Sequence, residues 1–215
     1  KYNIKREECD RFAIWSHQKA TKALRDKESY NNRIAPVHVP QPDGTTRIID
    51  TDETVRVQSL DEPDIAYSKL TTLEPRFTSD GVHTAGNSSQ ISDGAAATML
   101  MSEEKADELG LKPIVTIKSM AVAGDDPEIM LLGPIPAMRK ALRRAGNLTM
   151  EDMDVIEPNE AFASPPLAFA KEFGYAFDDP RVNPTGGAIA LGHPIGASGV
   201  IYFTEMIHQM QRKGL

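Results

Sequence analysis

The hydrophobic pattern of the chain first predicts a helix and then an irregular region. In residues 6–27 apolar and small side chains recur every three or four positions, which predicts an amphipathic helix. Residues 31–84 are polar, with turns at QPDGTT and TSDG and strand-like runs at IAPVHV, TRIID and TVRVQ. A linker of this length would not contain three strand-like runs, so we expect this stretch to fold into a compact unit. The predicted apolar helix face contains Cys9, Phe12, Ala13, Ser16, Ala20 and Ala23.

After residue 85 the pattern becomes a regular alternation of strands and helices. We expect buried strands at GAAATMLM and IVTIKSMAVA, and a strand running into a loop at DVIEPNEAF. We expect helices after Ser102, in IPAMRKALRRAG, in PPLAFAKEFG and over residues 195–213. Ser102 is a good N-cap, and the glycines that close the second and third of these segments are typical helix ends. The alternation predicts a layered α/β domain.

Composition and charge narrow the possible functions. The 215 residues are 40% hydrophobic and 26% charged, as in soluble globular proteins. No run approaches the roughly 20 apolar residues of a membrane span, and KYNIKREECDRF lacks the features of a signal peptide. The net charge of -7 argues against nucleic-acid binding. One cysteine rules out a disulfide framework, no residue cluster has metal-ligand spacing, and a cytoplasmic location is expected.

The glycine-rich stretch VNPTGGAIALGHPIGASG, residues 182–199, is the clearest candidate for a site. Gly186 and Gly187 permit positive φ and the close approach of a ligand. Pro194 suits a first helical turn, so His193 is expected near the positive end of a helix, where the dipole favours neutral imidazole. Such a histidine can accept a thiol proton or donate to an oxyanion. A glycine-rich turn with a structural histidine fits equally well, whereas a dinucleotide loop would need G-x-G-x-x-G.

Four segments occur in an order that resembles the signature blocks of the thiolases, the acyl-CoA C-acyltransferases. They are TAGNSSQISDGAAATML, GPIPAMRKAL, EPNEAFA and NPTGGAIALGHPIGASG, and their variants are most similar to degradative 3-ketoacyl-CoA thiolases. The resemblance implies a layered α/β fold of two βαβαβαββ halves with an inserted loop domain, incomplete in this chain. Residues 1–90 would be the loop domain and 91–113 the last strand and helix of the amino-terminal half. Residues 114–215 would be the carboxy-terminal half without its final strands.

The resemblance also implies an activity. Thiolases cleave 3-ketoacyl-CoA with CoA to acetyl-CoA and a shortened acyl-CoA, or catalyse the reverse condensation. Coenzyme A is then a substrate, no further cofactor or metal is needed, and the full-length protein would be a homodimer or homotetramer. Because the resemblance places both catalytic cysteines outside these residues, the chain alone is expected to be inactive. The alternatives are a non-catalytic CoA- or lipid-binding relative and a subunit completed by a partner chain.

Two catalytic residues follow from the resemblance. His193 matches the histidine that takes the proton from the nucleophilic cysteine and lines an oxyanion hole. Asn159, in NEAF, matches the asparagine that holds a water completing that hole. On the residues alone, Asn159 could instead cap a helix expected to begin near Ala161. Glu160 would be a rival general base, but the resemblance gives it a structural role.

Four residues are implied to bind coenzyme A. Ser89 would hydrogen-bond the pantetheine, Ala85 would contact it, and Phe77 would lie near the adenine and the arm. Arg56 would lie beside the nucleotide, where forked donors suit phosphate, although an exposed solvated arginine is the alternative. His83 is expected to be a surface strand histidine and no ligand.

Cys9 is the single thiol of the chain and is expected to be inert. Its acidic neighbours Glu7, Glu8 and Asp10 should raise its pKa, which opposes formation of a thiolate nucleophile. Its place on the apolar helix face predicts a small buried hydrophobic side chain.

Overall fold

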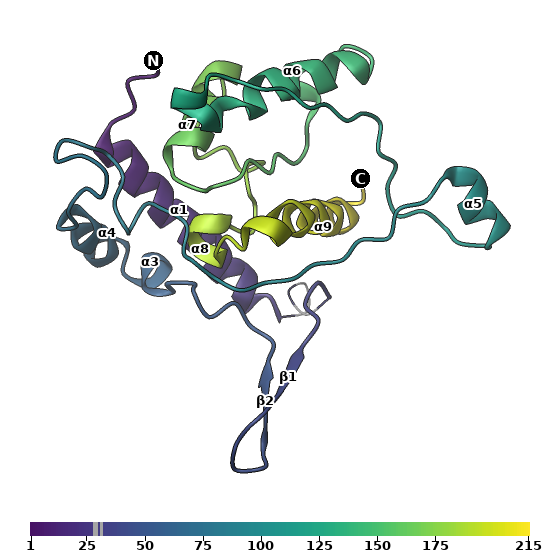
Figure 1. Ribbon diagram of the computed structural model, residues 1–215, viewed down its shortest axis with the longest axis horizontal. Helices are drawn as coiled ribbons and strands as arrows, with labels where there is room; N and C mark the ends of the chain where they lie inside the picture. The colour runs from purple at the N-terminus through teal and green to yellow at the C-terminus, as the bar shows by residue number, and fades with distance from the viewer. Residues whose placement is uncertain (28–29, 31) are drawn as a thin grey trace.

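The computed structural model describes residues 1–27, 30 and 32–215; Asn31, where the predicted irregular region begins, lies outside that part. Figure 1 shows one long helix, α1 (Arg6–Arg25), crossing the molecule diagonally with shorter helices gathered around it. An antiparallel hairpin and a long loop project away from this centre. The described chain therefore has one helical body and two extensions.

Helix α1 forms where the sequence predicts it and lies at the centre of the packing. It has glutamates in its first turn and basic residues in its last turn, which complement the helix dipole. Its predicted apolar face is buried throughout, and Phe12 packs in a core cluster with Leu70, Leu167 and Ile189. The helices that contact it are α3 (Gln58–Asp61), α4 (Pro63–Thr71), α7 (Ser164–Phe173) and α8 (Ala188–Leu191).

Residues 32–84 contain less strand than the sequence predicts. Strands β1 (Val37–Pro40) and β2 (Thr46–Ile49) form an antiparallel hairpin closed by the predicted QPDGTT turn. The prediction of a strand at TVRVQ is wrong, because residues 54–57 form turns and loop and the next residue opens α3. The TSDG turn is confirmed by a 3.0 Å bond from the Gly81 N–H to the Thr78 carbonyl.

The two buried strands expected after residue 93 are absent from the described chain. The chain is unpaired loop over residues 94–101 and 114–123, on either side of the short helix α5 (Glu103–Glu108). Figure 1 shows α5 at the far end of this long loop. Strand structure needs a neighbouring strand to accept its backbone bonds, and the described residues place none there. The side chains left exposed include Met99, Leu100, Ile114, Met120 and Val122.

The predicted helices of the carboxy-terminal part are confirmed. Helix α7 has prolines in its first turn and ends at Gly174, whose φ of 77° is the left-handed conformation expected of a terminating glycine. Helix α9 (Ile195–Lys213) has the predicted bounds, and Ser102 caps α5 by accepting the Lys105 N–H. The remaining helices of this part are 3-10 helix η1 (Pro127–Leu132), α6 (Pro134–Arg144) and 3-10 helix η2 (Met150–Asp152).

Two single β-bridges replace the strand predicted at DVIEPNEAF. Ile156 pairs in parallel with Val182, and Ser88 pairs antiparallel with Phe162. The first bridge brings the segment before Asn159 against the segment that leads to the glycine-rich stretch. The described chain is thus α/β, but its layered sheet is reduced to one hairpin and these bridges.

Candidate functional site

His193 lies immediately before helix α9, as the sequence predicts. Pro194 is the N-cap of the helix, and the imidazole Nδ1 lies 2.7 Å from the Ser198 Oγ one turn into it. The ring is partly buried, and this burial lowers the pKa of His193 below its usual value of 6.5. The lowered pKa agrees with the expectation of a neutral imidazole, but its leading cause is burial, whereas the sequence suggested the helix dipole.

The hydrogen bonds of Ser198 bear on which imidazole nitrogen carries a proton. The Ser198 hydroxyl donates to the Pro194 carbonyl at 3.0 Å. A hydroxyl has a single proton, so in this arrangement its oxygen accepts from the Nδ1–H of His193. The Nε2 of the ring is then left unprotonated and can accept a proton from a substrate or a thiol.

Asn159 is held by the same face of helix α9. Its side-chain Oδ1 accepts a 2.9 Å hydrogen bond from the Tyr202 hydroxyl. Ser198 and Tyr202 are four residues apart, the spacing at which side chains share one face of a helix. The two predicted catalytic residues are therefore both bound, one turn apart, by α9.

The alternative role of Asn159 as a helix cap is wrong. Helix α7 begins only at Ser164, its N-cap is Ala163, and no side chain caps it. The amide of Asn159 is exposed and is engaged with Tyr202 instead.

Glu160 is fully buried and joins three parts of the chain. Its carboxylate accepts from the Ser16 hydroxyl at 2.6 Å, the Asn183 amide at 2.6 Å and the Ile189 N–H at 3.3 Å. Through these three hydrogen bonds the carboxylate connects the NEAF loop to α1 and to the glycine-rich stretch. The geometry agrees with a structural role for this carboxylate.

Gly186 adopts the expected positive φ, and protein fills the space into which a side chain at Gly186 or Gly187 would point. A methyl group at Gly187 would lie 2.3 Å from the Glu160 carboxyl carbon. Gly186 has a φ of 86°, and a methyl group there would lie 2.7 Å from the Ala20 side chain. These glycines allow the loop to pack against α1 and Glu160.

Two buried ionisable groups near Glu160 were missed by the sequence analysis. Lys19 donates to the Val182 carbonyl at 2.7 Å and lies 3.0 Å from the centre of the Trp15 ring. Burial lowers the pKa of Lys19 to about 7. The carboxylate oxygens of Glu157 are buried with no hydrogen-bond partner in the described chain, and burial, with the nearby Glu205, raises the pKa of Glu157 well above 4.5.

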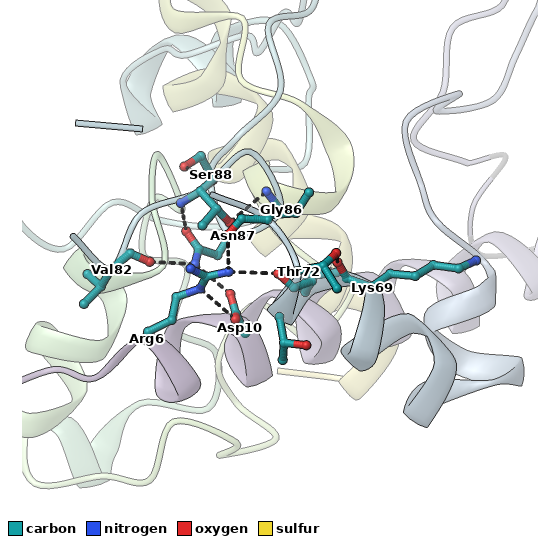
Figure 2. A network of polar contacts seen from close by, with 12 residues as sticks. Arg6, Asp10, Lys69, Thr72, Val82, Gly86, Asn87 and Ser88 are labelled. Atoms are coloured by element: carbon teal, nitrogen blue, oxygen red, sulfur yellow. Dashed lines mark hydrogen bonds and ion pairs between the residues drawn. The ribbon is translucent and has the colours of Figure 1, made fainter. Parts of the chain in front are cut away.

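A buried polar network ties the segment TAGNSS to α1 (Figure 2). The Asn87 amide donates to Asp10 at 2.8 Å and to the Val82 carbonyl at 2.9 Å, and its oxygen accepts the Thr84 N–H at 2.9 Å. Arg6 donates to Asp10 at 2.8 Å from the other side. Asn87 thus fixes the loop that carries Ala85 and Ser89.

The backbone of this loop joins it to both catalytic candidates. The Ser89 N–H donates to the Ala161 carbonyl at 3.0 Å, within the NEAF segment. The His193 N–H donates to the Gln90 carbonyl at 3.1 Å. The structure therefore brings Ser89, Asn159 and His193 into one neighbourhood on three converging segments.

The other predicted CoA contacts lie around this neighbourhood with exposed side chains. Ala85 is exposed on the same loop, and Phe77 is 70% exposed with its ring 5.7 Å from that of Phe162. The Arg56 side chain is exposed, and its backbone N–H donates to the buried His17 Nδ1 at 3.1 Å.

The prediction of His83 as a surface strand histidine is wrong. It lies in a loop, partly buried, with its ring 4.8 Å from that of Phe162 and its Nε2 3.1 Å from the Ser164 Oγ. Burial lowers the pKa of His83, which disfavours its charged form.

Cys9 is inert, as predicted. Its side chain is fully buried in the core of α1, and burial together with Asp10 and Glu8 raises the pKa of its thiol to about 12. At neutral pH this thiol carries no appreciable thiolate.

Two cavities lie beside α9. One of about 590 Å³ is open to solvent and lies between the loop on either side of α5 and the outer part of α9; its lining includes Met99, Ile114, Phe203 and Ile207. The other, of about 460 Å³, lies against Pro194 and Ile195 at the start of the helix. Only the second adjoins the His193 segment.

The described residues contain neither a candidate membrane span nor a candidate metal site. No helix there is both long enough and apolar enough to cross a bilayer. Within the same residues, His, Cys, Asp and Glu side chains nowhere gather in threes as a metal site would need.

The chain belongs to the thiolase family: residues 1–104 match the thiolase N-terminal domain and 111–215 match the thiolase C-terminal domain. This confirms the resemblance stated from the sequence.

Relatives and solved structures agree with this assignment. The chain is 49% identical over 214 residues to an acetyl-CoA acetyltransferase of Chromobacterium violaceum, covering 100% of this chain and 52% of the relative. It is 46% identical over 221 residues to a 3-ketoacyl-CoA thiolase of Bacillus subtilis, covering 99% of this chain and 54% of the relative. The chain thus spans about half the length of the relatives it matches.

Two solved structures superpose on the whole chain. The Bacillus anthracis acetyl-CoA acetyltransferase is 41% identical, with a TM-score of 0.91, 100% of this chain covered and 52% of that one. Human mitochondrial 3-ketoacyl-CoA thiolase in complex with CoA is 37% identical, with a TM-score of 0.85, 100% of this chain covered and 50% of that one.

Proposed function

We propose that the protein carrying this chain is a thiolase that cleaves 3-ketoacyl-CoA with CoA to acetyl-CoA and a shortened acyl-CoA, or catalyses the reverse condensation. One observation carries the proposal: a single face of α9 binds both His193, through Ser198, and Asn159, through Tyr202. The CoA complex of a structural neighbour supports coenzyme A as the substrate. No further cofactor takes part in the proposed reaction.

In the proposed mechanism, His193 acts as the base and Asn159 helps to stabilise negative charge. The Nε2 of His193 accepts the proton of a cysteine thiol that lies outside these residues, and the thiolate attacks the 3-keto carbon. Cleavage of the adjacent carbon–carbon bond releases the enolate of acetyl-CoA, which takes up a proton to give acetyl-CoA. The acyl-enzyme that remains is resolved by the thiol of a second CoA, which forms the new thioester and releases the cysteine. His193 and a water on Asn159 stabilise the thioester enolate oxygen.

We propose that coenzyme A binds along the loop held by Asn87. Ser89 would hydrogen-bond the pantetheine, with Ala85 and Phe77 alongside. The exposure of Ala85 and Phe77 and the position of Ser89 between the catalytic segments support this arrangement. Arg56 would reach the nucleotide, and its exposed side chain is free to approach a phosphate.

The domain division and the cellular setting are also proposals. Residues 1–90 would form the loop domain, 91–113 would end the amino-terminal half, and 114–215 would belong to the carboxy-terminal half. The change from one family domain to the other between residues 104 and 111 supports this division. The buried free thiol of Cys9 is compatible with a cytoplasmic location, and a homodimer or homotetramer is the expected assembly.

Exposed apolar side chains favour a second candidate function, that of a subunit completed by a partner chain. Met99, Ile114, Met120 and Val122 are more than half exposed on two unpaired segments. Strands supplied by the rest of a thiolase fold would pair with these segments and cover their side chains.

Turnover of a 3-ketoacyl-CoA tests the proposed activity. The full-length protein, incubated with acetoacetyl-CoA and CoA, is expected to produce acetyl-CoA, measured by mass spectrometry. The 215-residue chain alone is expected to give no product, because its single thiol, Cys9, is buried with a raised pKa. A full-length protein that binds CoA in calorimetry without forming product would identify a non-catalytic relative and overturn the proposal.

A further inference from the structure

Tyr202 is a polar aromatic side chain with apolar neighbours in the sequence of helix α9. The surrounding positions Ile201 and Phe203 are apolar, whereas Tyr202 carries a hydroxyl that lies 2.9 Å from the Asn159 Oδ1. In the part of the chain that the structure describes, this hydroxyl is the hydrogen-bond partner of the Asn159 amide. An exposed amide without such a partner would be free to rotate about its terminal bond.

The direction of this hydrogen bond determines which end of the amide is available. An amide has an oxygen that accepts and a nitrogen that donates, at opposite ends of one plane. With Oδ1 turned to Tyr202, the amide oxygen is occupied and the Nδ2 group is left to donate. A water that accepts from Nδ2 keeps both of its own protons for an oxyanion.

The surroundings keep Tyr202 in the donating form. Burial, followed by the charges of Glu160 and Glu157, raises the pKa of the Tyr202 phenol well above its usual value. The phenol therefore stays protonated at neutral pH. A protonated phenol can donate to the amide oxygen, as the structure shows.

We propose that Tyr202 is a positioning residue for the reaction, holding the Asn159 amide with its nitrogen toward the oxyanion. Tyr202 touches neither substrate nor reacting atoms and acts through Asn159. This inference rests on the proposed role of Asn159. The hydrogen bond that orients the Asn159 amide is made between two side chains 43 positions apart. A comparison of backbones with other thiolases would therefore not reveal it.

A double-mutant cycle in the full-length enzyme tests the proposal. Tyr202→Phe keeps the ring and removes the hydroxyl, so kcat should fall about tenfold, the equivalent of one ordinary hydrogen bond, with KM unchanged. Asn159→Ala should lower kcat on the order of 10²-fold. In the Asn159→Ala background, Tyr202→Phe should have no further effect, because the amide it positions is gone.

A matched control removes another phenol. Tyr2→Phe loses a 2.7 Å hydrogen bond to Glu172 of α7, which has no proposed part in catalysis or CoA binding, and should leave kcat unchanged. If Tyr202→Phe does not fold, Tyr202→Leu removes the same hydroxyl and carries the same expectation.

The outcomes separate the two proposals. If Asn159→Ala leaves kcat unchanged, the proposed role of Asn159 fails, and the inference fails with it. If Asn159→Ala lowers kcat but Tyr202→Phe does not, the inference alone is overturned. An equal loss from Tyr202→Phe in both backgrounds would also overturn it, because Tyr202 would then act independently of Asn159.

Discussion

The Gly187 backbone passes so close to the Glu160 carboxyl group that a methyl group on Gly187 would lie 2.3 Å from the carboxyl carbon. This contact seats the glycine-rich stretch on the buried acid that also binds Ser16 of α1. The loop that presents His193 is thus positioned by a packed contact several residues before the histidine itself.

Gly187→Ala should therefore destabilise the protein strongly. The backbone of Gly187 is extended, with a φ of -126°, so alanine meets no conformational barrier and the clash with Glu160 is the relevant effect. Overpacking of this kind costs about 1–3 kcal/mol, measurable by urea unfolding. Gly199→Ala is the matched control: nothing lies within 4 Å of its added methyl group, and an alanine within α9 should be neutral or stabilising. Equal stability of the two variants would show that the loop can move away from Glu160.

Asn87→Ala should loosen the loop expected to hold coenzyme A. The change leaves Asp10, the Val82 carbonyl and the Thr84 N–H without the partner that Asn87 provides, at a cost of about 1–3 kcal/mol or more. In the full-length enzyme, calorimetry should show weaker CoA binding. Asn32→Ala, which alters an exposed side chain, serves as the control. Unchanged stability and CoA affinity in Asn87→Ala would contradict the anchoring role.

His17 should make the stability depend on pH below neutrality. Its ring is buried, and burial, followed by the charge of Arg56, lowers its pKa to about 3. A group with a lowered folded-state pKa contributes its full stabilisation above the unfolded-state value of about 6.5. That contribution is lost as pH falls from about 6.5 toward 3, and over this window it amounts to a few kcal/mol.

His17→Asn isolates this contribution. Asparagine can still accept the Arg56 N–H that His17 accepts at 3.1 Å, but it does not titrate. Urea unfolding at a series of pH values should show a smaller loss of stability on acidification in the variant than in the original protein. Parallel pH profiles would mean that His17 is not neutral and buried in the folded state.

Exposed apolar side chains on either side of α5 should make the isolated chain associate. Leu100 and Met120 are 66% and 74% exposed on segments with unpaired backbone groups, a combination that promotes association between chains. Light scattering of the isolated chain should show self-association, and unfolding should be weakly cooperative. Replacing both residues with lysine should reduce the association. A monodisperse monomer with a sharp thermal transition would contradict this expectation.

Helices were predictable from the sequence because their signals are local. Each signal lies within one turn of the helix end that it marks: Ser102 begins α5, Gly174 ends α7, and basic residues occupy the last turn of α1. Strand formation depends on neighbours far away in sequence, so the apolar runs at 94–101 and 114–123 could not reveal that no partner lies beside them. The apolar pattern predicted strands at these runs, but whether a strand forms depends on a pairing partner that the pattern does not show.

The site was only partly predictable for the same reason. His193 and Asn159 lie in recognisable motifs, and both lie where α9 can bind them. Tyr202 was missed because it stands among apolar residues of a helix, and its partner lies in another segment. The spacing from Ser198 to Tyr202 was the available signal, since positions four apart on a helix share a face. Lys19 lies in no motif, and Glu157 opens the EPNEAFA segment without a role of its own there, so burial is what distinguishes them.

The central claim is that His193 performs chemistry, and His193→Asn in the full-length enzyme tests it most directly. Single-turnover acylation by a 3-ketoacyl-CoA should slow on the order of 10²–10³-fold, while the Kd for CoA, measured by calorimetry, stays near its original value. Ser89→Ala should show the reverse, with weaker CoA binding and a smaller effect on acylation. If His193→Asn instead lowered only the melting temperature, and the folded fraction acylated at the original rate, His193 would be a structural residue at the start of α9 and the account would be contradicted.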